Sequence, residues 1–97
     1  MPKAYAVVCY HLAPDPQKFA TYVKLATAAV APFGARYLAR TTASAAYEVG
    51  LKERTVIAEY PSLEKAIAAR ESAAYGEALK ALGDGVVRDF RIVEGLE

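Results

Sequence analysis

The stretch 54–62, with the sequence RTVIAEYPS, constrains the fold more than any other part of the chain. Its β-branched and small apolar interior predicts a central strand that is covered on both faces. Pro61 ends this strand, and Ser62 is a suitable N-cap for a helix that follows at once. Glu59 interrupts the apolar run, and a lone carboxylate must be either solvated or paired. The direction in which Glu59 points therefore decides where a site can lie.

The rest of the chain alternates between strand and helix patterns. Asp15 followed by Pro16 predicts the N-cap and first position of a helix that Pro32 and Gly34 end. Ser72 predicts a second N-cap, which breaks the last helical region near residue 71. The predicted elements in chain order are strand 5–12, helix 16–30, strand 35–42, strand 54–60, a short helix from 63, helix 73–82 and strand 86–93. Residues 46–49 could form either a short strand or an extended arm.

This order of elements predicts one α+β domain over residues 1–97 with the ferredoxin-like β-α-β-β-α-β arrangement. Two right-handed β-α-β units then form a four-stranded antiparallel sheet with the helices on one face. We expect strands 5–12 and 54–60 to be central and to run parallel to each other. The other face of the sheet would be bare in a monomer.

Composition excludes several classes of function. The formal net charge is +1, so the chain has no basic field for nucleic acid. Cys9 is the one cysteine, which rules out an internal disulfide, and a single histidine argues against a metal site. No apolar run approaches the roughly 18 residues of a membrane span, and the first residues do not resemble a signal peptide. A cytoplasmic location is the default expectation.

Charged residues indicate which face of each strand avoids the helices, because side chains alternate along a strand. This parity assigns to the open face Tyr5, Val7, Cys9 and His11; Arg36, Leu38 and Arg40; Thr55, Ile57 and Glu59; and Asp89, Arg91 and Val93. It assigns to the helix side Val56, Ala58, Tyr60, Phe90 and Ile92. A face that mixes apolar and charged groups predicts a two-fold homodimer in which two sheets enclose a cavity.

Strand direction adds a prediction about the site. If the two central strands run parallel, their ends lie together with the starts of the other two strands. His11, Glu59, Arg36 and either Asp89 or Arg91 should then gather at one end of the sheet.

Four phrases of the sequence resemble the DUF1330 family, an uncharacterised family within the dimeric α+β barrel superfamily. They are 33–40 (FGARYLAR), 54–62 (RTVIAEYPS), 72–75 (SAAY) and 92–95 (IVEG). The resemblance implies a ferredoxin-like fold and a dimer, and it implies no established activity. Family members often carry arginine where this chain has Gly83, and glycines where it has Thr41 and Thr42. These departures put in doubt an anion site that such an arginine would help to build.

The candidate site residues each have a functional and a structural interpretation. His11 could be a general base oriented by Glu59, or a strand-end histidine that meets solvent. Glu59 could instead form a cross-strand ion pair with Arg36. Tyr5 would line the cavity. The arginines of the open face, Arg36, Arg40 and Arg91, could bind a carboxylate or phosphate, or they could be rim charges of the dimer.

Two residues are interpreted as structural. Arg54 leans away from the open face by parity, and Cys9 is more often a buried small residue than a nucleophile.

Two hypotheses about function follow. The first is a cofactor-free enzyme with His11 and Glu59 as catalytic residues. It would catalyse either proton transfer or oxygenation on a small apolar or anionic molecule. The second is a non-catalytic small-molecule-binding or protein-interaction domain in which the same residues form structural ion pairs. A cavity of about 300 Å³ or more lined by His11 and Glu59 would favour the enzyme.

Overall fold

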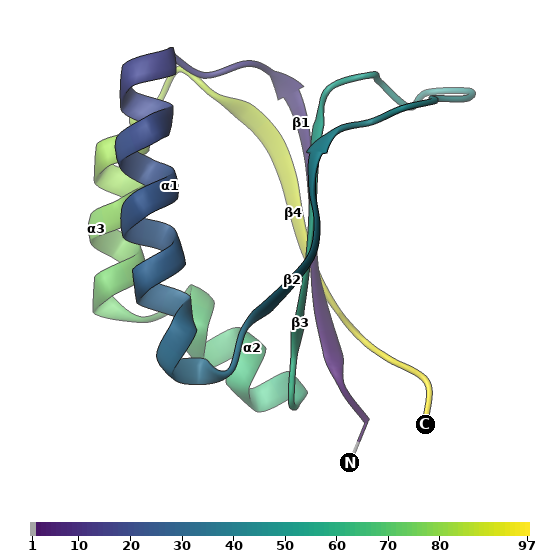
Figure 1. The fold of residues 1–97 in the computed structure, drawn as a ribbon, viewed down its shortest axis with the longest axis vertical. Coiled ribbons are helices and arrows are strands. Elements are labelled where there is room, and N and C mark those ends of the chain that lie inside the picture. The colour runs from purple at the N-terminus through teal and green to yellow at the C-terminus, as the bar shows by residue number, and fades with distance from the viewer. Residues whose placement is uncertain (1) are drawn as a thin grey trace.

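The structure, a computed structural model, describes residues 2–97 as a sheet covered on one face by helices (Figure 1). In chain order the elements are β1 Ala4–Leu12, α1 Pro16–Val30, the 3-10 turn η1 Ala31–Phe33, β2 Arg36–Thr42, β3 Arg54–Tyr60, α2 Leu63–Arg70, α3 Ala73–Leu82 and β4 Val87–Glu94. The predicted ferredoxin-like α+β class is confirmed.

Side-chain caps begin each helix at the predicted residue. The Asp15 carboxylate accepts from the backbone N–H groups of Gln17 and Lys18 at the start of α1. Ser62 caps α2 and Ser72 caps α3 in the same way. Such caps satisfy backbone donors that have no partner inside the helix, so they fix where each helix begins.

The sheet has the strand order β2-β3-β1-β4, and every neighbouring pair is antiparallel. The predicted parallel pairing of β1 with β3 is wrong. Each β-α-β unit does contain two parallel strands, but a strand of the other unit lies between them. The end of β1 therefore lies beside the starts of β3 and β4.

The predicted inward and outward faces hold for three of the strands. On β1, alternate residues from Ala4 to Tyr10 are buried, and on β3 both Ala58 and Tyr60 are buried against the helices. Phe90 of β4 also packs toward this core. In β2 a register shift between Tyr37 and Ala39 interrupts the alternation.

The connection between β2 and β3 is an arm without a strand, which projects from one end of the sheet in Figure 1. Two of its apolar side chains, Tyr47 and Val49, are 80% and 96% exposed. Residues 46–49 form no strand, and the arm ends in a turn in which the Gly50 N–H donates to the Tyr47 carbonyl and Glu48 has a φ of +56°.

Small side chains form the contact between the sheet and the helices. Alanines from both layers are buried there, namely Ala4, Ala6, Ala26, Ala29, Ala58, Ala66, Ala69 and Ala78. The larger core residues, such as Tyr22, Tyr60 and Tyr75, stand around them. Within residues 2–97 no helix is long and apolar enough to cross a membrane.

Candidate functional site

The residues predicted to form one site lie at opposite ends of the open face. Tyr5 of β1 pairs with Glu59, whereas His11 lies six residues further along the same strand. At about 3.3 Å per residue this separation is roughly 20 Å. The prediction that Glu59 orients His11 is therefore wrong, and its cause is the antiparallel direction of β3.

His11 instead contacts Asp89. The predicted cluster included this pair, so that part of the prediction agrees with the structure. The His11 Nε2 and an Asp89 carboxylate oxygen are 3.0 Å apart, and Arg91 Nε lies 3.3 Å from the other oxygen. The hydrogen bond with His11, followed by the charge of Arg91, lowers the pKa of the Asp89 carboxyl below its ordinary value. This cluster lies on the exposed sheet surface.

Glu59 forms an ion pair at the other end of the open face. Its carboxylate lies 3.4 Å from Lys3 Nζ. Arg36 is its register partner on β2, and Tyr5 is its partner on β1. A structural ion pair for Glu59 was one of the two interpretations, but its observed partner is Lys3.

Arg40 points to the helix side of the sheet. Its guanidinium lies 4.1 Å from the centre of the Tyr37 ring and donates to the Thr27 hydroxyl of α1 at 3.2 Å. The prediction that Arg40 lies on the open face is wrong, because the register shift after Tyr37 reverses the alternation of β2.

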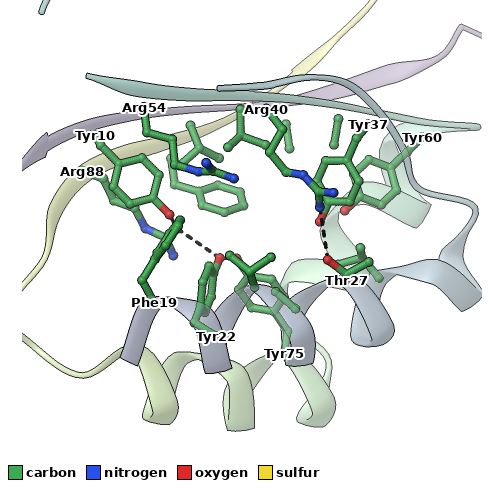
Figure 2. A pocket seen from close by; sticks show the side chains of 18 residues that line it. Tyr10, Phe19, Tyr22, Thr27, Tyr37, Arg40, Arg54, Tyr60, Tyr75 and Arg88 are labelled. Carbon is green, nitrogen blue, oxygen red and sulfur yellow. Dashed lines mark hydrogen bonds between the residues drawn. The ribbon is translucent and has the colours of Figure 1, made fainter. Parts of the chain in front are cut away.

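A pocket of about 50 Å³ lies between the sheet and the helices, on the side away from the predicted site (Figure 2). Its lining residues are Ala6, Val8, Tyr10, Phe19, Tyr22, Val23, Ala26, Thr27, Val30, Tyr37, Arg40, Arg54, Val56, Ala58, Tyr60, Tyr75, Arg88 and Phe90. Side chains from the sheet and from α1 and α3 point toward one another across it. Neither His11 nor Glu59 lines this pocket.

The pocket exists because its middle is lined by small residues. Ala6 and Ala58 are register partners at the centre of the sheet, and Ala26 lines the same space from α1. Larger rings, such as those of Tyr37 and Tyr60, surround this apolar centre. Short side chains on facing layers leave a space that the backbone cannot close.

Arg88 is a half-buried arginine of the pocket lining. One of its Nη atoms donates to the hydroxyls of Tyr10, at 2.9 Å, and Tyr22, at 3.0 Å. The guanidinium also lies 5.1–5.4 Å from the ring centres of Tyr10, Tyr22 and Phe90. Burial disfavours its charged form, but the neighbouring tyrosines, led by Tyr22, outweigh burial and raise the pKa of Arg88. Arg88 therefore remains a half-buried cation.

The tyrosine hydroxyls continue this hydrogen-bond network. Tyr22 bonds to the hydroxyl of Tyr75, which comes from α3. Burial raises the pKa of Tyr75 and of Tyr10, and it raises that of Tyr60 to about 12. These phenols stay protonated near neutral pH and can donate hydrogen bonds.

Arg54 lies beside Phe19 with its guanidinium 4.8 Å from the ring centre. Its Nε is buried and has no acceptor among the residues that the structure describes. Arg54 also borders a second, more open space of about 270 Å³. That space is lined by Tyr10, Ala13, Pro14, Pro16, Phe19, Thr42, Glu53 and Arg54. Since Tyr10, Phe19 and Arg54 line both spaces, the two adjoin at these residues.

The polar groups of the inner pocket are mainly hydrogen-bond donors. It is lined by three guanidinium groups and five phenol hydroxyls, and among residues 2–97 no carboxylate, imidazole or thiol lines it. Arginine and tyrosine donate hydrogen bonds, so the pocket can hold negative charge on oxygen but offers no side-chain base. In the described part of the chain, no group of three or more His, Cys, Asp and Glu residues could hold a metal ion.

Sequence reasoning overlooked Arg88 and assigned Arg54 a structural role. The signal for both was available: Arg88 shares the parity of Phe90, and Arg54 shares that of Val56. The same parity that turned Arg54 away from the open face would also have placed Arg88 on the helix side, where a charged side chain needs a partner.

Comparison with known proteins supports the fold. The sheet order and its helical cover are those of the ferredoxin-like α+β class. The sequence matches the family described as "Domain of unknown function (DUF1330)" over residues 3–96, so the chain belongs to the DUF1330 family. No curated protein matches the sequence.

Two solved structures share the fold at low sequence identity. A protein of unknown function from Rhodopseudomonas palustris is similar with a TM-score of 0.75 and 16% identity, over 99% of this chain and 84% of that chain. SnoaB, described as a cofactor-independent oxygenase from Streptomyces nogalater, is similar with a TM-score of 0.64 and 14% identity, over 100% of this chain and 96% of that chain. At these identities the likeness is one of fold.

Proposed function

We propose that the protein binds a small organic anion in the pocket between the sheet and α1. The observation that carries this proposal is the presence of Arg40, Arg54 and Arg88 around a pocket without a lining carboxylate. Arg54 and Arg88 are half-buried and Arg40 is exposed, and no carboxylate of the pocket lining pairs with them. A bound anion would supply the opposite charge that the lining lacks. Hydrogen bonds between guanidinium groups and an oxyanion are also among the stronger ones.

The size of the pocket limits the ligand. Its volume of about 50 Å³ is well below the roughly 300–1,000 Å³ of pockets for drug-sized molecules. The proposed ligand is therefore an anion of few heavy atoms, with a short apolar part that packs against Ala6 and Ala58.

The proposal is tested by thermal unfolding in the presence of small carboxylates, with sodium chloride at matched ionic strength as the reference. A ligand at 100 times its Kd should stabilise the folded state by about 2.7 kcal/mol and raise Tm accordingly. Arg40→Gln should weaken the effect, whereas Arg36→Gln, on the open face, should not. Equal Tm values in chloride and in every carboxylate would contradict the proposal.

Catalysis without a cofactor on the bound anion is a second candidate function. Its support is the set of arginine and tyrosine donors, which would stabilise a substrate anion, together with the fold shared with a protein described as a cofactor-independent oxygenase. In an oxygenation of this kind the substrate anion itself donates the electrons to O2. Oxygen uptake with small phenols at a pH where they are already ionised, compared between the wild type and Arg88→Lys, tests this candidate; equal uptake would contradict it.

We also propose that two copies associate through the open sheet face. Leu38 and Val93, which we assign to that face, are 48% and 47% exposed. In Figure 1 the helices cover only the other face of the sheet. Catalysis by His11 stays a prediction that belongs to a site between two such copies. The expected cytoplasmic location also stays a prediction.

A further inference from the structure

We infer that Arg54 is the specificity-determining contact of the inner pocket, and that it binds the carboxylate of the ligand side-on through its Nε–H and one Nη–H. This inference rests on the proposed anion binding and names the chemical class of the ligand. It assigns the bound group as a planar carboxylate attached to a short apolar body.

The hydrogen-bond partners distinguish Arg54 from the other two arginines. An Nη of Arg88 already donates to Tyr10 and Tyr22, and an Nη of Arg40 donates to Thr27. The Nε–H of Arg54 is buried, and within residues 2–97 it has no acceptor. A buried donor without a partner lowers the stability of the fold, so its presence points to a group that arrives from outside.

The position of Arg54 in the sheet places it at the centre of the positive charge. Tyr10 pairs with Arg88 on β4, and the register of β1 with β3, continued one residue beyond Cys9 and Thr55, brings Arg54 opposite Tyr10 on the other side. The two arginines therefore flank one phenol. The charges of both act on Tyr10, since each opposes the effect of burial on the pKa of its hydroxyl.

The side chain of Arg54 is also held in place. Its guanidinium lies against the ring of Phe19, and its backbone begins β3. A guanidinium offers its Nε–H and one Nη–H as two parallel donors along one edge, a spacing that matches the two oxygens of a carboxylate. Lysine carries the same charge but cannot reproduce this planar pair of donors.

The walls on either side define the rest of the ligand. Arg54 stands where the inner pocket adjoins the outer space, and the inner pocket continues past it along Val8, Val56 and Ala58. A carboxylate at Arg54 would direct an apolar body of a few carbons along these side chains. Glu53 lines the outer space, where it would repel a second anionic group. A monocarboxylate fits this arrangement better than a dicarboxylate.

The inference is tested by isothermal titration calorimetry of acetate, propionate, butyrate and succinate. The protein variants are the wild type, Arg54→Lys and, as a matched control on the open face, Arg91→Lys. Arg54→Lys should weaken the binding of the best monocarboxylate by about 10- to 100-fold, which is the effect expected from losing one hydrogen bond between charged groups. Arg91→Lys should bind as the wild type does, and propionamide, which lacks the charge, should not bind.

The outcomes distinguish a failure of the proposed anion binding from a failure of the role assigned to Arg54. If the wild type binds none of these carboxylates, the proposed anion binding itself fails. If the wild type binds them and Arg54→Lys binds them equally well, only the assignment of Arg54 fails. Tighter binding of succinate than of butyrate would overturn the monocarboxylate assignment.

A second measurement covers the case in which Arg54→Lys does not fold. The Nε–H group of Arg54 in the ¹⁵N-labelled wild type should give an NMR signal that shifts on titration with the carboxylate. An unchanged Arg54 signal in the presence of bound ligand would overturn the inference.

Discussion

At the scale of single residues, burial sets the pKa of the Tyr60 hydroxyl. Tyr60 is 5% exposed, and burial raises the pKa of its hydroxyl to about 12, followed by smaller effects of Tyr37 and Tyr22. Because the folded pKa lies above the unfolded value near 10, the stability that this group contributes is complete below pH 10. That contribution is lost as the pH rises from 10 through 12.

This shift predicts the alkaline behaviour of Tyr60→Phe. Raising the pH from 9 to 11 should lower the free energy of unfolding of the wild type by about 1 kcal/mol more than that of the variant. Urea unfolding at the two pH values gives the difference. A variant that loses the same free energy as the wild type between pH 9 and 11 would show that Tyr60 titrates normally in the folded protein.

His11 provides a second prediction at this scale. Its ring contacts Asp89 on the open face and does not line the inner pocket. His11→Ala should therefore change the carboxylate Kd by less than about twofold, well under the 1.4 kcal/mol of a tenfold change. Calorimetric titration of the variant measures this. A loss of binding would move the ligand to the open face, where sequence reasoning expected it.

At the scale of elements, Gly34 allows the turn before β2 to pack against the turn after β3. It follows η1 with a φ of +84°, and a Cβ at this position would meet Pro61 Cγ at 2.8 Å. Pro61 belongs to the connection between β3 and α2. The turn before β2 and the turn after β3 are therefore packed so closely that a side chain at Gly34 does not fit.

We predict that Gly34→Ala lowers the free energy of unfolding by roughly 1–3 kcal/mol, since it combines an unfavourable positive φ with a steric overlap. Gly76→Ala is the matched control, because it lies inside α3 and a Cβ there has no atom within 4 Å. That control should stabilise the fold by about 0.5–1 kcal/mol through helix propensity. Chemical denaturation measures both, and an equal effect of the two substitutions would contradict the predicted contact.

Elements could be predicted from the sequence where their signals are local. Asp15, Ser62 and Ser72 mark helix starts because a cap depends on residues within one turn. The shift after Tyr37 has no such signal, since a bulge in an edge strand depends on the partner strand. This is why the face of Arg40 was wrong although the position of β2 was nearly right.

At the scale of the whole molecule, the bare sheet face predicts self-association. We expect sedimentation at micromolar concentration to show a dimer of the 10.4 kDa chain. The double substitution Leu38→Lys and Val93→Lys should give a folded monomer, because it places charges on apolar contact surface. Leu25→Lys, on the exposed side of α1, is the control and should remain dimeric. A wild type that sediments only as a monomer would remove the proposed interface.

The ferredoxin-like architecture followed from the order of elements, but the site did not. A rule that assigns charged residues to the open face worked for His11, Glu59 and Arg91, which do lie there. It gives no information about a cation held inside. The alternation of β4 places Arg88 on the helix side. Its partners there, Tyr10 of β1 and Tyr22 of α1, come close to it only when the layers pack.

The strand order carries a consequence for the growing chain. β1 emerges first from the ribosome, yet both of its sheet neighbours, β3 and β4, come later in the chain. Its backbone groups cannot form their first ladder until β3 has been synthesised, and the second ladder needs β4, Val87–Glu94. Contacts of such long sequence separation slow folding. A nascent chain stalled before β4 would leave one edge of β1 unpaired, so β4 completes the sheet that β1 begins.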